Sequence, residues 1–350
     1  MNNKKYVAYA VIFVVLAVLV YLQFRTWQNF DWARFRETRP QKWRHILHGI
    51  ALIYLAYVVR AIRWKIFLRP VRPQASSASL VAPTIIGFTG LALLGRPGEL
   101  IRPYLIARRQ NLTFSSQLAV WAVERIFDIG AFTVLLVSAI FVAAGPRSLP
   151  FYSRFREGGF LLVALVAGIS LGAAAVHWKG EAIADWIEQR FSHLAANLGR
   201  KIATRVREFR SGLNTIHSPL SLLALIVLSV LMWFMIIMAY QEVAHSYGVA
   251  ILNIRRSQVL VLMGASMIGS MVQLPGIGGG SQLATIATLQ RIFDVPPELA
   301  ASCGIMLWLV TFVAVVPVGL LLSHHERLSL RKLSAETEQA DAVAAVEEAT

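Results

Sequence analysis

Long apolar runs alternate along the chain with shorter polar segments that are rich in arginine. A helix needs about 20 apolar residues to cross roughly 30 Å of hydrocarbon, and six runs come close to that length or exceed it. The predicted membrane-spanning helices are 6–24, 46–68, 117–144, 159–178, 220–243 and 299–323. The first run is too long for the core of a signal peptide, and no small-residue cleavage site follows it, so we expect it to remain a span.

Two further apolar runs, 80–94 and 259–274, are short and contain glycine. Each is followed by a Pro-Gly pair, at 97–98 and at 275–276. Short segments interrupted by Gly or Pro, in corresponding positions of two halves, indicate the binding sites of many transporters. We therefore predict two re-entrant hairpins arranged as an inverted repeat. The alternative is that both short segments cross the membrane fully.

The composition supports a membrane protein. Of the 350 residues, 56% are hydrophobic and only 15% are charged, and the mean hydropathy is +0.58. A soluble chain has about 25% charged residues, so this one lacks the polar side chains to cover a soluble surface. The predicted fold is an all-α integral membrane protein with one polytopic domain, 1–325, and an acidic, disordered tail, 326–350. The single cysteine, Cys303, lies in an apolar run and predicts neither a disulfide nor a metal cluster.

The formal net charge of +15 favours basic cytoplasmic loops and contact with anionic lipid headgroups. We expect no nucleic-acid partner, because no basic and aromatic stretch stands outside the apolar runs. The predicted location is a bacterial cytoplasmic membrane with both termini cytoplasmic. One observation opposes this topology, since the loop 25–44 would be external yet carries five arginines and Lys42.

The basic stretch 179–217 has apolar residues at steps of three and four, which is the period of one helical face. It predicts an amphipathic helix on the cytoplasmic leaflet. The alternative is a helical hairpin packed against the bundle.

The first candidate site follows the first short run. Arg96, Glu99 and Arg102 are spaced three apart, which on a helix places them on one side. Arginine suits phosphate because its guanidinium donates paired hydrogen bonds from a permanently charged plane. This pattern predicts capture of an anionic headgroup. An ordinary interfacial Arg–Glu pair would give the same spacing.

The second candidate lies inside the predicted span 117–144, which contains Glu124, Arg125 and Asp128. At 1.5 Å per residue these side chains lie roughly 10–17 Å inside the helix. Ionisable groups at that depth cost at least about 2.5 kcal/mol each unless they are paired or hydrated, so they indicate function. Arg60 and Arg63 of the second span are the expected partners. A structural salt-bridge knot is the alternative, and one cluster can serve both purposes.

The third candidate is a glycine-rich turn before a short helix, whose backbone N–H groups offer a site for an anion. Its residues are Pro275, Gly276, Gly278, Gly279, Gly280, Ser281 and Gln282. It lacks the Gly-Lys-Ser/Thr ending of a phosphate-binding P-loop, and a flexible break between helices would look the same. No metal-ligand spacing or nucleophile elbow occurs, so we expect no metal, no cofactor and no enzymatic activity.

Residues 95–102, Leu105 and 123–128 together resemble the lysylphosphatidylglycerol synthase transmembrane-region family, which is also described as flippase-like. The glycine-rich turn 275–282 and the segment 296–298 resemble the late hairpin of that family. The resemblance covers roughly residues 5–325. It implies a multi-spanning inner-membrane protein that moves a lipid between leaflets. In two-part members this region flips an aminoacylated phospholipid that a separate synthase domain makes, and this chain has no room for such a domain.

Two departures from the family pattern concern the cargo. Gln282 stands where many relatives have Glu, and no Arg is present near Trp308 in the last span. These changes favour a phosphate- or sugar-bearing lipid over a cationic aminoacyl-lipid. The predicted function is therefore a lipid flippase or scramblase acting on phospholipid, polyprenyl-phosphate or hopanoid-type lipids. The alternative is a non-transporting membrane partner that presents lipid to a separate glycosyl- or aminoacyl-transferase.

Overall fold

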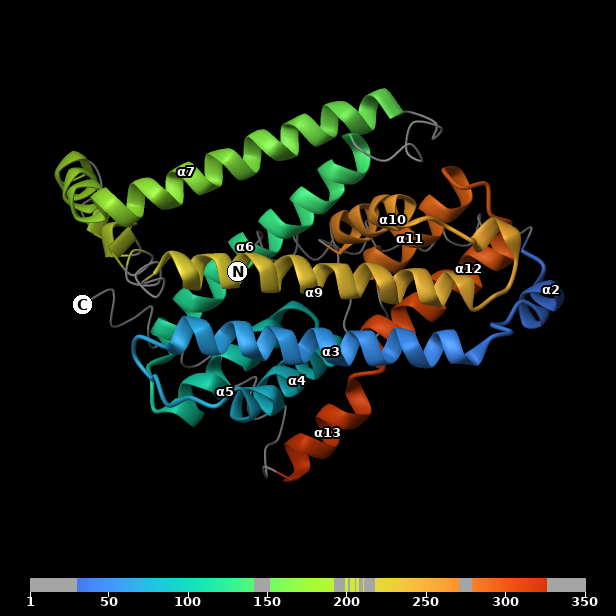
Figure 1. The fold of residues 1–350 in the computed structure, drawn as a ribbon, viewed down its shortest axis with the longest axis horizontal. Coiled ribbons are helices and arrows are strands. Elements are labelled where there is room, and N and C mark those ends of the chain that lie inside the picture. The colour runs from blue at the N-terminus through green and yellow to red at the C-terminus, as the bar shows by residue number, and fades with distance from the viewer. Residues whose placement is uncertain are drawn as a thin grey trace, which may run out of the picture.

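The computed structural model describes residues 30–141, 152–191, 199–200, 202–204, 206–207, 210, 218–270 and 279–325. Every regular element in these ranges is helical (Figure 1). The predicted span 6–24 and the tail 326–350 lie outside the described residues.

The helices follow one another along the chain in the order shown in Figure 1. They are α2 (Trp32–Glu37), α3 (Trp43–Leu68), α4 (Ser77–Leu94), the 3₁₀ turn η1 (Arg96–Leu100), α5 (Ile101–Gln110), α6 (Phe114–Phe141), α7 (Tyr152–Phe191), α9 (Pro219–His245), η3 (Ala250–Leu252), α10 (Arg256–Gly269), α11 (Gly279–Arg291), α12 (Pro297–Trp308), the π-helical turn η4 (Leu309–Val313) and α13 (Val316–His325).

Four helical stretches of the described chain are long and apolar enough to cross a membrane. They are α3, α4, α9 and the run from Pro297 to His325 that comprises α12, η4 and α13. Helix α6 has 28 residues, but its middle contains the three ionisable residues of the second candidate site. The structure therefore confirms helical elements with four such stretches over the described residues, and it does not confirm the predicted count of six spans.

The predicted short run 80–94 lies within α4, a continuous helix of 18 residues that begins at Ser77 and passes through Pro83. This helix is long and apolar enough to cross a membrane, so its re-entry stays a prediction. Three predicted spans fall within single helices, 46–68 within α3, 159–178 within α7 and 220–243 within α9. The predicted span 299–323 is divided over α12, η4 and α13.

Helices α3 and α9 lie antiparallel and define two ends of the bundle. At the Trp43 end, where α3 begins, His45 Nδ1 lies 2.7 Å from Glu242 Oε2 near the end of α9. Toward the Leu68 end, where α3 finishes, Arg63 Nη1 donates to Ser229 Oγ at 2.8 Å. Gly49 permits the close approach of the two helices, because a Cβ there would lie 3.4 Å from the Ala239 carbonyl oxygen.

Helices α4 and α5 form a hairpin that opens at the Leu68 end. Gln110 Nε2 at the end of α5 lies 3.4 Å from Ser79 Oγ near the start of α4, so the chain returns to where it entered. Glycine makes the close packing possible: a Cβ on Gly98 would overlap the backbone carbonyl of Gly90, and a Cβ on Gly87 would lie 2.5 Å from Arg102 Cβ.

Helices α10 and α11 form a second close pair on the opposite side of the bundle. A Cβ on Gly269, at the end of α10, would overlap the carbonyl oxygen of Gly280 in the first turn of α11. Helix α10 begins near the Trp43 end, where Gln241 Nε2 of α9 donates to the Ile254 carbonyl oxygen at 2.9 Å. The two hairpins thus open at opposite ends of the bundle.

The tip of the first hairpin contacts the end of α10. Arg96 in η1 donates from Nη2 to the backbone carbonyl oxygen of Ser270, which caps the end of α10, at 3.1 Å. A cation at the C-terminus of a helix is favourable because it complements the negative end of the helix dipole.

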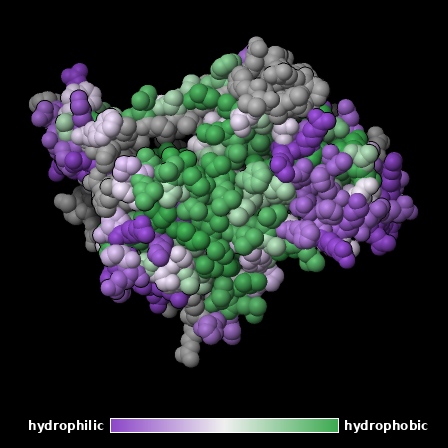
Figure 2. All heavy atoms as spheres, in the orientation of Figure 1, coloured by the Kyte–Doolittle hydropathy of each residue, from purple (hydrophilic) through white to green (hydrophobic). Residues whose placement is uncertain are grey.

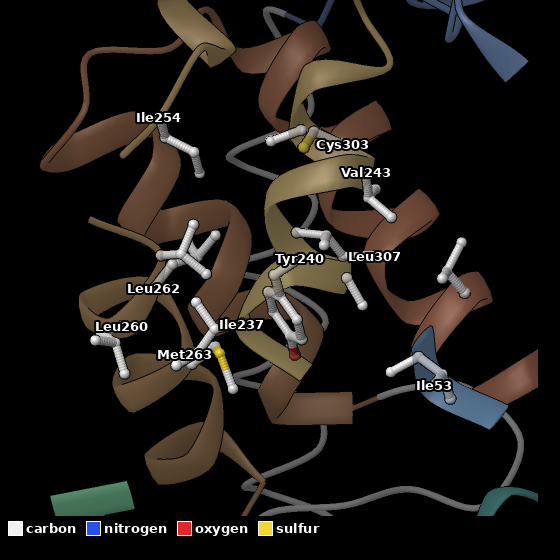
Figure 3. Close-up of a cluster of buried hydrophobic side chains, with 14 of the residues drawn as sticks. Ile53, Ile237, Tyr240, Val243, Ile254, Leu260, Leu262, Met263, Cys303 and Leu307 are labelled. Atoms are coloured by element: carbon white, nitrogen blue, oxygen red, sulfur yellow. The ribbon is translucent and has the colours of Figure 1, made fainter. Parts of the chain in front are cut away.

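The main hydrophobic core lies between α3, α9, α10 and α12 (Figure 3). The buried Cys303 lies within it. The run from α12 to α13 is interrupted by η4, and two tyrosines of α3 donate hydrogen bonds to backbone carbonyl groups in and just after this turn. Tyr54 donates to the Ala314 oxygen at 2.8 Å and Tyr57 to the Thr311 oxygen at 3.5 Å.

The predicted single amphipathic helix over 179–217 is corrected to two segments that pair with each other. Arg207 contacts Glu181 at 3.2 Å, Asp185 at 2.9 Å and Glu188 at 2.9 Å. Residues 26 positions apart would lie about 39 Å apart on one straight helix, so these ion pairs require the chain to turn back. Hydrogen bonds to Glu188 and Asp185 raise the pKa of Arg207.

Figure 2 shows hydrophobic residues in a broad band across the middle of the face, with hydrophilic residues toward both ends of the bundle. Large apolar side chains are exposed along α3 and α9, among them Leu47, Leu55, Leu223 and Val227. A contiguous exposed apolar surface of this kind is typical of contact with lipid.

Candidate functional site

The centre of the candidate site is a set of ion pairs between α3 and α6. Arg63 Nη2 lies 2.7 Å from Glu124 Oε1 and 2.7 Å from Asp128 Oδ1. Arg60 Nη1 lies 2.9 Å from Asp128 Oδ2 and 3.7 Å from Glu124 Oε1. On each helix the two residues are three or four positions apart and therefore share a face. The predicted partnership between the two spans is present in the structure.

Arg102 of α5 enters the same set from the first hairpin. Its guanidinium bonds to both carboxylate oxygens of Glu124, with Nη1 at 3.2 Å from Oε1 and Nη2 on Oε2. Its Cζ lies 4.4 Å from the ring centre of Trp64 and 5.5 Å from that of Phe88. The Trp64 ring is held by a 3.0 Å hydrogen bond from Nε1 to Gln117 Oε1. Stacking on aromatic faces and a bidentate carboxylate together fix the plane of this arginine.

Arg125 completes the set but is held least tightly. Its Nη2 lies 3.7 Å from Glu124 Oε2 and 3.5 Å from Asp128 Oδ2, and its side chain is 37% exposed. We call Arg60, Arg63, Arg102, Glu124, Arg125 and Asp128 the buried charge cluster.

The cluster lies deep along its helices. Arg60 is eight residues before the end of α3 and Glu124 is ten residues after the start of α6. At 1.5 Å per residue the two lie roughly 12 Å and 15 Å from the Leu68 end. Both residues are buried, and Glu124 is fully so.

A small pocket adjoins the cluster. It is lined by Gly87, Phe88, Leu91, Glu99, Arg102, Trp121 and Arg125. Its volume is about 20 Å³, and about 10–15 Å³ suffices for one water molecule. In this conformation the pocket therefore admits a small group and no whole headgroup.

The first candidate site is divided by the structure. Arg96, Glu99 and Arg102 were expected on one helical side, but the 3₁₀ turn η1 precedes α5, and only Glu99 and Arg102 line the same pocket. Arg96 contacts the carbonyl oxygen of Ser270, Glu99 lines the pocket and Arg102 belongs to the cluster.

The third candidate is described only in part. Pro275, Gly276 and Gly278 lie outside the described residues. Gly279, Gly280, Ser281 and Gln282 form the first turn of α11. Anion binding at this helix start stays a prediction.

Several residues of the site were not predicted from sequence. They are the aromatic residues Trp64, Phe88 and Trp121 and the polar partners Gln117 and Ser229. Helical periodicity could have indicated two of them. Gln117 is seven residues before Glu124 and Trp121 is four before Arg125, so each pair shares one face of α6.

No group of His, Cys, Asp and Glu suitable for a metal ion is found within the described residues.

Comparison with known proteins places the chain in a family of membrane proteins. A protein of Methanothermobacter thermautotrophicus named UPF0104 membrane protein is 23% identical over 321 residues, which are 89% of this chain and 92% of that protein. Glycosyltransferase AglD of Haloferax volcanii is 33% identical over 86 residues, which are 24% of this chain and 14% of that protein. No solved structure matches the chain significantly. The pattern of the family described as Lysylphosphatidylglycerol synthase TM region matches residues 7–319, so the chain belongs to that family.

Proposed function

We propose that this protein moves a lipid with an anionic or glycosylated headgroup between the leaflets of the cytoplasmic membrane, as a flippase or scramblase without covalent chemistry. The observation that carries this proposal is the buried charge cluster, which brings six ionisable side chains of α3, α5 and α6 together inside the bundle. Each would cost at least about 2.5 kcal/mol in hydrocarbon if unpaired. Ionisable side chains can line a polar route for a lipid headgroup, because they replace the water around its charges.

The two hairpins supply the second support. In the proposed placement both are re-entrant, one opening at the Leu68 end and the other at the Trp43 end, and Arg96 at the tip of the first contacts Ser270 at the end of α10. Irregular backbone at membrane depth is tolerated where it lines a polar cavity. Helix α5 brings Arg102 to the cluster from just beyond the first tip.

The Leu68 end is proposed to face the cytoplasm. The segments 69–76 and 108–116, which connect helices at this end, contain four arginines and no acidic residue, which follows the positive-inside rule. The paired segments of 179–210 would then lie on the cytoplasmic side, as the sequence predicts.

Reconstitution tests the proposal directly. Vesicles would contain the purified protein and a trace of phosphatidylglycerol with a fluorophore on one acyl chain, and a membrane-impermeant reductant would be added outside. We expect the fraction of fluorescence lost to rise well above about half, the value for protein-free vesicles. The assay would be repeated with a polyprenyl-phosphate probe, and with each probe in the presence and absence of a proton gradient. A fluorescence loss that remains at about half under all these conditions would overturn the proposal.

A second candidate function is the presentation of lipid to a separate transferase. The observation in its favour is the 86-residue match to a protein named as a glycosyltransferase. Affinity purification from native membranes distinguishes the two functions. A stoichiometric transferase partner, together with no lipid movement in vesicles, favours presentation.

A further inference from the structure

The charges of the buried cluster do not balance. The cluster holds four arginines and two carboxylates, which leaves two positive charges among the ion pairs of the described residues. Glu99 on the pocket wall offsets one of them. One positive charge therefore remains, and arginine cannot lose it by deprotonation in a protein. A site with one excess positive charge favours a ligand that carries a single negative charge, because opposite charges attract.

Arg125 is the arginine best placed to receive that ligand. Its contacts to the carboxylates are 3.5 Å and 3.7 Å, whereas those of Arg63 are 2.7 Å. The Nε atom of Arg125 is buried and has no hydrogen-bond partner. A buried donor without a partner carries an uncompensated desolvation cost, which a hydrogen bond to a ligand would offset.

The pocket beside the cluster presents two of its arginines. Arg102 and Arg125 both line it, with Phe88 and Trp121 as apolar walls. Two guanidinium groups on one small pocket form a fork that matches the oxygens of a phosphate. The ammonium groups of a cationic headgroup would instead meet two arginines and one carboxylate, which is repulsive.

We propose that this pocket binds the phosphodiester of a lipid whose headgroup has a net charge of −1, with Arg125 and Arg102 as the donors, and that it selects against zwitterionic and cationic headgroups. This rests on the proposed function for its lipid ligand, and it names the charge class of that lipid. The same phosphate chemistry could belong to a soluble phosphate ester, so the test includes both sources.

Binding is measured apart from transport, by the rise in thermal stability that a ligand of the folded state produces. The purified protein in a neutral detergent would be titrated with short-chain phosphatidylglycerol, phosphatidylcholine and lysylphosphatidylglycerol, and with inorganic phosphate and glycerol phosphate. We expect phosphatidylglycerol alone to raise the melting temperature. Arg125→Gln should weaken its apparent affinity about tenfold, as the loss of a charged hydrogen bond does. Arg125→Lys keeps the positive charge but loses the paired donors of the guanidinium. Its apparent affinity for phosphatidylglycerol should lie between those of the wild type and Arg125→Gln.

Arg207→Gln is the matched control, because Arg207 pairs with carboxylates in the 179–210 segments and lies outside the pocket. This variant should bind phosphatidylglycerol with the same apparent affinity as the wild type. Equal stabilisation by phosphatidylcholine, or undiminished phosphatidylglycerol binding by Arg125→Gln, would overturn the inference. Equal stabilisation by inorganic phosphate would assign the pocket to a soluble anion and overturn the lipid ligand. Selective binding without lipid movement in vesicles would leave this inference standing and reject translocation.

Discussion

Glu124→Gln is expected to destabilise the protein by about 3–5 kcal/mol, the loss typical of a buried ion pair that keeps only one partner. Glu124 is fully buried and contacts all four arginines of the buried charge cluster. Removal of its charge leaves four arginines with one buried carboxylate, and it breaks the bidentate contact with Arg102 that ties the first hairpin to α6.

The measurement is the melting temperature in detergent, followed by tryptophan fluorescence, and a fall of roughly 5–10 °C is expected. Glu181→Gln is the control. Glu181 also pairs with two arginines, Arg207 and Arg210, but its side chain is 57% exposed. Exposed pairs contribute at most about 1 kcal/mol. Equal shifts for the two variants would mean that the cluster is not buried as described.

Gly98→Ala is expected to have the second large effect, because it forces the first hairpin apart. A Cβ on Gly98 would overlap the carbonyl group of Gly90 in α4, and neither backbone can yield without moving η1. Overpacking of this kind costs about 1–3 kcal/mol, or more where backbone meets backbone. Because Arg102 follows four residues later, the same displacement should withdraw it from Glu124 and slow lipid movement.

Gly130→Ala is the matched control for this substitution. Gly130 lies in α6, and a Cβ there would meet nothing within 4 Å. Alanine favours a helix over glycine by about 1 kcal/mol, so this variant should be as stable as the wild type or slightly more. Both proteins would be compared by melting temperature and by monodispersity after purification. A Gly98→Ala protein as stable as Gly130→Ala would contradict the close packing of α4 against η1.

Hydropathy and depth were sufficient to predict the centre of the site. Glu124 and Asp128 lie in a long apolar helix, and charged groups there require partners, so Arg60 and Arg63 at comparable depth in another span could be named from sequence. The paired Pro-Gly motifs predicted two re-entrant hairpins. The helix pairs α4–α5 and α10–α11 open at opposite ends of the bundle, and their re-entry into the membrane stays a prediction.

Features that depend on tertiary packing could not be predicted from the sequence. Arg96 and Arg102 share a helical face in an ideal helix, but the contact of Gly98 with Gly90 stabilises a 3₁₀ turn between them and separates their partners. The aromatic cage of Arg102 comes from α3 and α4, and no local pattern specifies which aromatic residues meet across helices. The division of 179–217 depends on ion pairs to Arg207, which a periodicity argument does not detect.

The most direct test of the account compares rates of phosphatidylglycerol movement in vesicles that contain equal amounts of wild-type protein, Arg125→Gln or Arg207→Gln. Arg125 adjoins the pocket and is the least tightly paired arginine of the cluster, so its loss should spare folding. The account predicts rapid movement for the wild type and Arg207→Gln, and a rate about tenfold lower for Arg125→Gln. No movement beyond protein-free vesicles, or equal rates for all three proteins, would contradict the claim that the buried charge cluster forms the path of a lipid headgroup.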